Sequence, residues 1–173
     1  MKRTNEHTYL VVISGMDKIG KNTLIDWVAK NNPNDYIVYK SNKSALSTVQ
    51  DIRKLHEKYP DKYIITKDLW IKDAVYSTSN VNYKNDIEDI FNGKVINIVF
   101  AWKSVYDYSN RIKKITGRDF LCDENAKNIF SKTKKLFEKY GLENDAKIFN
   151  NITNDSTPSS MYEKYERVLC SIF

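Results

Sequence analysis

The sequence predicts an α/β fold in which a parallel sheet is covered by helices on both faces. Short apolar runs alternate along the whole chain with segments of helical periodicity, which is the pattern of parallel strands joined by crossover helices. The first apolar run also leads directly into a glycine-bounded loop, a lysine and a helix-like segment at residues 9–27. No internal repeat or linker interrupts this pattern, so residues 1–173 are expected to form a single domain.

Each expected strand is a short run of β-branched or aromatic residues bounded by polar residues, glycine or proline. The expected strands are residues 8–14, 36–39, 63–66, 95–100 and 146–149. The expected helices are residues 21–31, 45–58, 69–79, 84–91, 103–115, 123–140 and 158–171.

In the amino-terminal half, the first strand shows little alternation and is expected to be buried on both faces. The helix after it offers four apolar side chains to the sheet: Leu24, Ile25, Trp27 and Val28. After a turn at residues 31–35, the second helix has an apolar face made by Leu46, Val49, Ile52 and Leu55. A break at residues 59–61 precedes the third strand, which delivers Asp68 at its end.

In the carboxyl-terminal half, the short helix at 84–91 is expected to end at Asn92-Gly93. The fourth strand is followed by a helix and by a charged connection at residues 115–120. Gly141 is expected to stop the long helix that begins at residue 123. A weak fifth strand and a closing helix complete the alternating pattern.

The segment Gly15-Met-Asp17-Lys18-Ile-Gly20-Lys21-Asn22-Thr23 has the layout of a phosphate-binding loop. Gly15 and Gly20 allow the backbone to curl, so that several N–H groups point inward at a phosphate. The helix that begins near Lys21 adds the positive end of its dipole, and the lysine reaches the outer phosphates as a mobile point charge. Asn22 departs from the strict motif, which has a Mg²⁺-ligating Ser or Thr there, although an amide oxygen is an acceptable hard ligand.

The composition narrows the class of protein and its partners. A hydrophobic content of 41% with 29% charged residues is ordinary for a soluble globular protein. No apolar run has the length of a membrane span and residues 1–7 lack the apolar core of a signal peptide, so a cytoplasmic protein without a membrane partner is expected. Cys122 and Cys170 show no metal-binding spacing, which fits a reducing compartment. The net charge of +6 favours phosphorylated metabolites as partners, and nucleic acid stays open as a less favoured one because the lysines are scattered.

At the level of these motifs the chain resembles the thymidylate kinase family, and more closely the small deoxynucleoside monophosphate kinases encoded by viruses and phages. The loop at residues 15–23 is similar to the family's G-x-D-x-x-G-K-[ST]-T, in which the acid, here Asp17, is the distinguishing residue. Asp68-Leu69-Trp70, followed by Tyr76, looks like the family's Asp-Arg-aromatic segment. The run from Arg111 into the long helix looks like an arginine-bearing lid at residues 111–122, and residues 150–153 fall where the family contacts the base.

The resemblance implies a three-layer P-loop NTPase fold with a five-stranded parallel sheet in the order 2-3-1-4-5. It implies ATP-dependent phosphorylation of a (deoxy)nucleoside monophosphate, thymidylate-like, to the diphosphate by in-line transfer. ATP and Mg²⁺ are the implied cofactors, and small nucleotides are the implied partners. A homodimer is a further option that the resemblance raises, and a viral origin would place the protein in the host cytoplasm.

The candidate site residues follow from the motif and from this resemblance. The catalytic candidates are Lys21, Lys18, Arg118 and Asp68, and the Mg²⁺ candidates are Asn22 and Asp68. The candidates for binding ATP are Gly15, Asp17, Gly20, Lys21, Asn22, Thr23, Arg111 and Asn151. The candidates for binding the acceptor are Asp17, Lys40, Arg53, Trp70 and Tyr76. For several of them a structural role is the alternative: a helix cap for Asp68, a turn for Asp17, surface ion pairs for the arginines and core packing for the aromatic residues.

The loop after the second strand bears on the class of acceptor. A nucleoside hydroxyl needs a general base, and deoxynucleoside kinases resemble one another in placing an acid there, whereas residues 39–43 are cationic and contain no acid. This favours a phosphate acceptor. Leu69 replaces an arginine that the family uses near the acceptor phosphate, so another cation must take that role, with Lys40, Lys43 and Arg53 as candidates.

Two alternatives stay open. A nucleoside or polynucleotide 5′-kinase would use an acid among Asp17, Asp68 and Asp73 as its base. A catalytically impaired nucleotide-binding protein is the other alternative, suggested by the substitutions at Asn22 and Leu69.

Overall fold

A five-stranded parallel sheet forms the middle layer of the molecule. The computed structural model describes residues 8–40, 45–71, 83–119, 122–143 and 146–171. The strands are β1 Leu10–Gly15, β2 Tyr36–Val38, β3 Tyr63–Lys67, β4 Val95–Trp102 and β5 Lys147–Ile152. They pair in the order β2-β3-β1-β4-β5, and every pairing is parallel. The predicted fold class and strand order are therefore confirmed.

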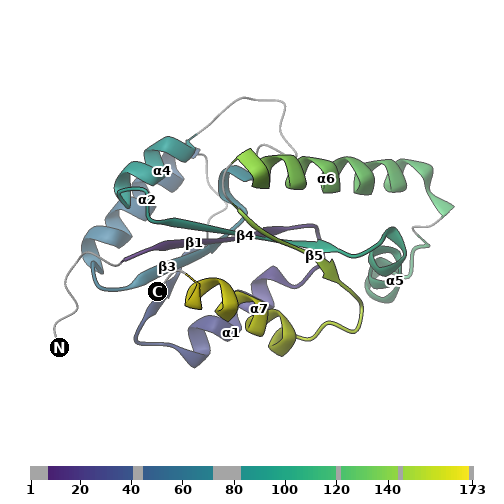
Figure 1. Cartoon of the computed structure of the whole chain (residues 1–173), viewed down its shortest axis with the longest axis horizontal. Helices are drawn as coiled ribbons and strands as arrows, with labels where there is room; N and C mark the ends of the chain where they lie inside the picture. The colour runs from purple at the N-terminus through teal and green to yellow at the C-terminus, as the bar shows by residue number, and fades with distance from the viewer. Residues whose placement is uncertain (1–7, 41–44, 72–82, 120–121, 144–145, 172–173) are drawn as a thin grey trace.

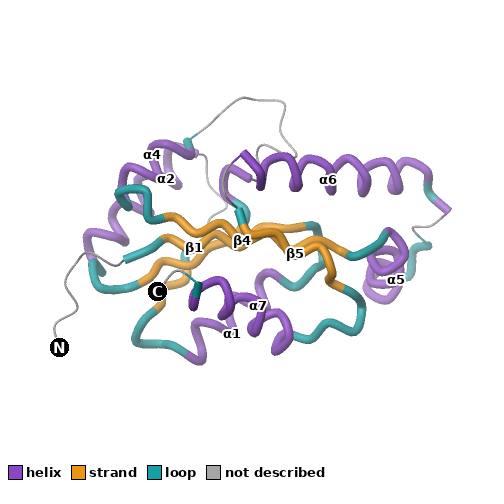
Figure 2. Tube along the Cα trace, viewed as in Figure 1, coloured by secondary structure: helices purple, strands orange, loops and turns teal. Residues whose placement is uncertain are grey.

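Helices cover both faces of this sheet (Figures 1 and 2). Their bounds are α1 Lys21–Asn31, α2 Ala45–Lys58, α4 Lys84–Ile90, α5 Val105–Thr116, α6 Glu124–Glu143 and α7 Pro158–Cys170. Figure 1 shows α2, α4 and α6 on one face and α1 and α7 on the other, with α5 beyond the end of the sheet. Among the described helices, none combines the length and the apolar character that crossing a membrane requires.

The central strand is buried along its whole length because β3 and β4 flank it and helices cover both of its faces. All six residues of β1 are buried, and Leu10, Val11, Val12 and Ile13 are completely inaccessible to solvent. A fully covered central strand explains why its sequence is a continuous apolar run rather than an alternating one. The strand ends at Gly15, so the loop that follows emerges from the central strand of the sheet.

The predicted elements agree with the structure to within a few residues. All five strands are found, with β4 and β5 longer at their carboxyl ends than predicted. Most of the helix expected at residues 69–79, from residue 72 onward, lies outside the described part of the chain. The polar break expected at residues 78–82 also lies outside it.

Three local predictions are wrong. Trp27 is 41% exposed, because the buried stripe of α1 is Leu24, Ile25 and Val28, and residue 27 lies about 100° of helical rotation from its middle. Leu46 is 70% exposed, and Thr48, buried at 3% exposure, faces the core in its place. Gly141 does not stop α6, which runs to Glu143, since glycine in a helix costs only about 1 kcal/mol relative to alanine.

Candidate active site

Two glycines shape the loop between β1 and α1. Gly15 has a φ of +155°, and a Cβ there would overlap the carbonyl oxygen of Phe100 on β4, so only glycine fits. Gly20 has a φ of +97° and is the N-cap residue of α1, where its carbonyl oxygen accepts a 3.0 Å hydrogen bond from Leu24 N. The backbone therefore leaves β1 against one neighbouring strand and enters α1 through a left-handed turn. The amino terminus of α1 faces the same loop, as a phosphate-binding site requires.

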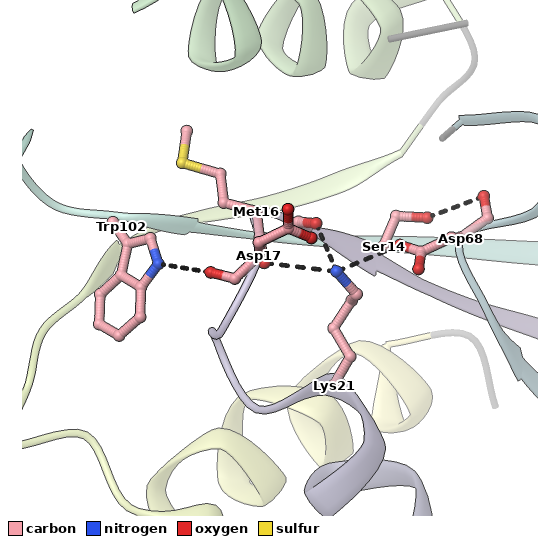
Figure 3. A network of polar contacts seen from close by, with 7 residues as sticks. Ser14, Met16, Asp17, Lys21, Asp68 and Trp102 are labelled. Atoms are coloured by element: carbon pink, nitrogen blue, oxygen red, sulfur yellow. Dashed lines mark hydrogen bonds and ion pairs between the residues drawn. The ribbon is translucent and has the colours of Figure 1, made fainter. Parts of the chain in front are cut away.

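Hydrogen bonds hold this loop from two sides (Figure 3). Lys21 Nζ donates to the carbonyl oxygens of Gly15 at 2.6 Å and Met16 at 3.3 Å. On the other side, the indole Nε1–H of Trp102, at the end of β4, donates to the carbonyl oxygen of Asp17 at 3.2 Å. The loop is thus shaped by its own lysine and by the neighbouring strand.

Asp68 lies beside the loop, as predicted from its place at the end of the third strand. Its backbone N–H donates to Ile13 O at 2.9 Å, and its carboxylate Oδ1 lies 3.3 Å from Lys21 Nζ. Ser14 Oγ donates to the Asp68 carbonyl oxygen at 3.4 Å. The register of β1 and β3, which pairs Ile13 with Lys67, brings the ends of the two strands together and so sets this contact.

Three non-glycine residues around this site have left-handed backbone conformations. The φ angles are 60° for Lys18, 64° for Asp68 and 37° for Leu69. Such conformations cost of order 1–3 kcal/mol each and persist where the surrounding structure enforces them, often at binding sites. Their concentration at the ends of β1 and β3 agrees with a functional role for this edge of the sheet.

A pocket of about 440 Å³ opens at this edge. Its lining residues are Asp17, Lys18, Ile19, Gly20, Lys21, Asn22, Thr23, Lys67, Asp68, Arg111 and Ile115. Four of these side chains are cationic and two are carboxylates. Lys21 pairs with Asp68, but among the residues that the structure describes Lys18, Lys67 and Arg111 form no ion pair. The pocket therefore has an excess of positive charge suited to an anionic ligand.

Many of the site residues predicted from the phosphate-loop motif and from the family resemblance meet in this pocket. Asp17, Lys18, Gly20, Lys21, Asn22, Thr23, Asp68 and Arg111 all line it. Gly15 adjoins it through its hydrogen bond with Lys21. Arg111 reaches the pocket from α5 together with Ile115, one helical turn further along.

Sequence reasoning missed three lining residues: Ile19, Lys67 and Ile115. For Lys67 a signal was present, because it directly precedes Asp68 at the end of the same strand. For Ile115 the four-residue spacing from Arg111 was the available signal.

Several predicted site residues lie outside the pocket. Arg118 is exposed beyond Gly117, whose φ of 73° ends α5, and Asn151 is exposed on β5. Lys40 Nζ forms a 3.0 Å surface ion pair with Asp26 Oδ1, and Arg53 is exposed on α2. None of these four side chains lines the pocket.

Of the two aromatic candidates, only Trp70 lies in the described part of the chain. Trp70 is 2% exposed and meets Tyr83 edge to face, with ring centroids 6.3 Å apart, so it packs in the core and does not reach the pocket. Tyr76 and Lys43 lie outside the described residues.

The donor atoms in the pocket suit Mg²⁺. Asn22, Thr23 and Asp68 offer an amide oxygen, a hydroxyl and a carboxylate, which are the hard oxygen ligands that this ion prefers. Within the described ranges no three His, Cys, Asp or Glu side chains gather as a metal-binding group.

Comparison with known proteins assigns the fold. No family model matches the chain, and no curated protein matches its sequence. The YorR protein of Bacillus subtilis, solved in complex with phosphorylated GDP, aligns with a TM-score of 0.63 at 16% identity, over 92% of this chain and 95% of its own. A gluconokinase from Sinorhizobium meliloti aligns with a TM-score of 0.58 at 10% identity, over 98% of this chain and 95% of its own.

Two nucleoside- and nucleotide-directed kinases are also similar. Deoxyadenosine kinase from M. mycoides, with dCMP and dCDP bound, has a TM-score of 0.52 at 18% identity, over 94% of this chain and 99% of its own. Thymidylate kinase from Ehrlichia chaffeensis has a TM-score of 0.51 at 11% identity, over 94% of this chain and 98% of its own. At these identities the similarity establishes that the chain has the fold of the P-loop kinases.

Proposed function

We propose that this chain is an ATP-dependent kinase that phosphorylates a (deoxy)nucleoside monophosphate, thymidylate-like, to the diphosphate. The observation that carries the proposal is the pocket at the ends of β1 and β3. It combines a glycine-shaped loop, the amino terminus of α1 and four cationic side chains, three of them without an ion-pair partner among the described residues. Phosphoryl transfer depends mainly on charge neutralisation and alignment, and these groups supply both.

Lys21 is the proposed ligand of the β- and γ-phosphates. Its ammonium group contacts two loop carbonyl oxygens and the carboxylate of Asp68. Phosphate oxygens in the loop would replace the two neutral carbonyl oxygens with charged, stronger acceptors. Lys18 and Arg111, which border the same pocket, would stabilise the charge on the migrating phosphoryl group.

The transfer itself needs no general base. An oxygen of the acceptor's phosphate, already anionic at neutral pH, attacks the γ-phosphorus and forms the new P–O bond. The bond from the γ-phosphorus to the β–γ bridging oxygen breaks, and its electron pair leaves with ADP. Mg²⁺, when bound, neutralises charge on the phosphate oxygens, and Asn22, Thr23 and Asp68 are the residues that would hold it.

A coupled ADP-release assay with ATP and Mg²⁺, run against a panel of nucleosides and nucleoside monophosphates, tests the proposal. We expect turnover on at least one monophosphate and loss of about 10²-fold or more in Lys21→Ala, because the variant lacks the charge that neutralises the phosphates. Binding of ATP without turnover on any acceptor would contradict the proposal and favour a nucleotide-binding protein without catalysis. In that case Asn22→Ser tests whether the missing hydroxyl is the cause.

A second candidate is a kinase that phosphorylates a hydroxyl. Two carboxylates, Asp17 and Asp68, line the pocket, and either offers the base that such an acceptor needs. Asp68 is engaged with Lys21, so Asp17 is the better placed of the two. If nucleosides are phosphorylated in the panel, Asp17→Asn should lower that activity by about 10²-fold or more while ATP binding is retained.

A further inference from the structure

We infer that Lys67 binds the phosphate of the acceptor nucleotide, an inference that rests on the proposed function. Lys67 is the last residue of β3 and lines the pocket beside the phosphate loop. Its backbone is fixed by the sheet, because it pairs with Ile13 of β1 and the next residue, Asp68, donates to Ile13 O at 2.9 Å. The position of this lysine relative to the loop is therefore set by strand pairing.

The surroundings of Lys67 leave its charge available. The residue is half-buried, and no ion pair or hydrogen bond of its side chain is found within the described part of the chain. Lys21 differs in this respect, since two carbonyl oxygens and a carboxylate already hold its ammonium group. An anionic ligand in the pocket would supply the counter-ion that this ammonium group lacks among the described residues.

The sheet order separates the two sides of the pocket. β3 lies on one side of β1 and β4 on the other, and α5, which carries Arg111, follows β4. Lys67 therefore reaches the pocket from the side opposite to Arg111. The donor's phosphates occupy the loop itself, and the attacking phosphate must lie beyond the γ-phosphorus, in line with the bond that breaks. A cation on the β3 side is placed for this second phosphate.

Two of the other cations considered for this role, Lys40 and Arg53, do not line the pocket. Lys40 is paired with Asp26 on the surface, and Arg53 is exposed on α2. Leu69, where related kinases carry an arginine, is 7% exposed and packs in the core. The left-handed conformations at residues 68 and 69 turn the chain immediately after β3, so Lys67 is the cation that this strand end offers to a ligand.

Equilibrium binding separates this role from a general effect on the site. The probes are thymidine and deoxyguanosine 5′-monophosphates, the two matching nucleosides and ATP, measured on the whole chain. We expect the wild-type protein to bind at least one monophosphate about tenfold or more tightly than its nucleoside, and Lys67→Met to lose most of that preference. ATP affinity should stay within about twofold, which also shows that the variant is folded, and Lys67→Arg should keep most of the preference.

Lys62→Met is the matched control. Lys62 directly precedes the same strand, at the end opposite to Lys67, and lies outside the pocket. Its replacement should therefore change neither the affinity for ATP nor the affinity for the monophosphate. If Lys67→Met weakens ATP binding as much as monophosphate binding, or leaves the monophosphate preference intact, the inference is wrong. A wild-type protein that neither prefers nor phosphorylates any monophosphate would instead overturn the proposed function, and the inference with it. The wild-type and variant results thus distinguish the two failures.

Discussion

At the scale of single residues, Lys21 links the structure of the loop to the proposed activity. Its ammonium group contacts Gly15 O, Met16 O and Asp68 Oδ1, so the loop supplies oxygens where phosphate oxygens are expected to bind. This arrangement keeps the lysine inside the pocket and stabilises the curled loop. A side chain held in place in this way would lose less conformational entropy on binding the proposed phosphate ligand.

A histidine away from the pocket gives a pH-dependent prediction. The His56 ring packs on Phe91 with centroids 4.6 Å apart, and its Nδ1 is buried without a hydrogen-bond partner in the described part of the chain. Burial lowers the pKa of His56 below its ordinary value of 6.5, an effect that the nearby Glu57 partly opposes. Because the unfolded chain then binds this proton more readily, the contribution to stability is complete above about pH 6.5 and is lost as the pH falls below that value.

We therefore expect the free energy of unfolding to fall more steeply between about pH 7.5 and about pH 5.5 in the wild-type protein than in His56→Gln. Chemical denaturation at the two pH values measures the difference. His7 is the chain's other histidine, and it is present in both proteins, so its contribution cancels. Equal pH dependence in the two proteins would show that His56 is not protonated on unfolding in this range.

At the scale of elements, β4 determines the shape of the loop that leaves β1. The carbonyl oxygen of Phe100 leaves room only for glycine at position 15 and accepts a 3.3 Å hydrogen bond from Met16 N. Two residues further along β4, the Trp102 indole holds the carbonyl of Asp17. One strand thus fixes the start and the middle of the loop, while α1 fixes its end.

The Trp102 contact predicts a positioning role. Trp102 is buried, at 3% exposure. Trp102→Phe removes the N–H donor and keeps an aromatic ring at this position. We expect the KM for ATP to rise by about three- to tenfold, since a hydrogen bond contributes about 0.5–1.5 kcal/mol, with a smaller change in kcat. The comparison is steady-state kinetics against Trp27→Phe, which alters an exposed tryptophan of α1. An unchanged KM in Trp102→Phe would mean that the loop keeps its shape without this bond.

Local patterns predicted the elements and the phosphate loop because each depends on residues close in sequence. The apolar run of β1 and the glycines at 15 and 20 show their roles in the sequence itself. Lys67 and Trp102 were not predicted as site residues, because their roles depend on how β3 and β4 pair with β1. Arg53 was a candidate because a guanidinium suits phosphate chemically, but its position could not be predicted in the same way: it lies on an exposed face of α2, outside the pocket.

At the scale of the whole molecule, the sheet order explains where the pocket forms. With β3 and β4 on either side of β1, the carboxyl ends of three strands deliver Lys67, Asp68, the loop and Trp102 to one edge. Ligands of open parallel sheets bind at this edge, outside the carboxyl ends of the strands. The fold of the P-loop kinases is shared by proteins that act on different acceptors, so the acceptor has to be decided by residues of this pocket.

Transfer of labelled phosphate is the most direct test of the central claim, that this pocket moves the γ-phosphoryl group of ATP to a nucleotide phosphate. The protein is incubated with γ-labelled ATP, Mg²⁺ and the monophosphate panel, and the products are separated and identified. We predict label in a nucleoside diphosphate formed from the acceptor, with transfer reduced about 10²-fold or more in Lys21→Ala. Label found only in inorganic phosphate or on a nucleoside hydroxyl, or transfer that persists in Lys21→Ala, would contradict the account.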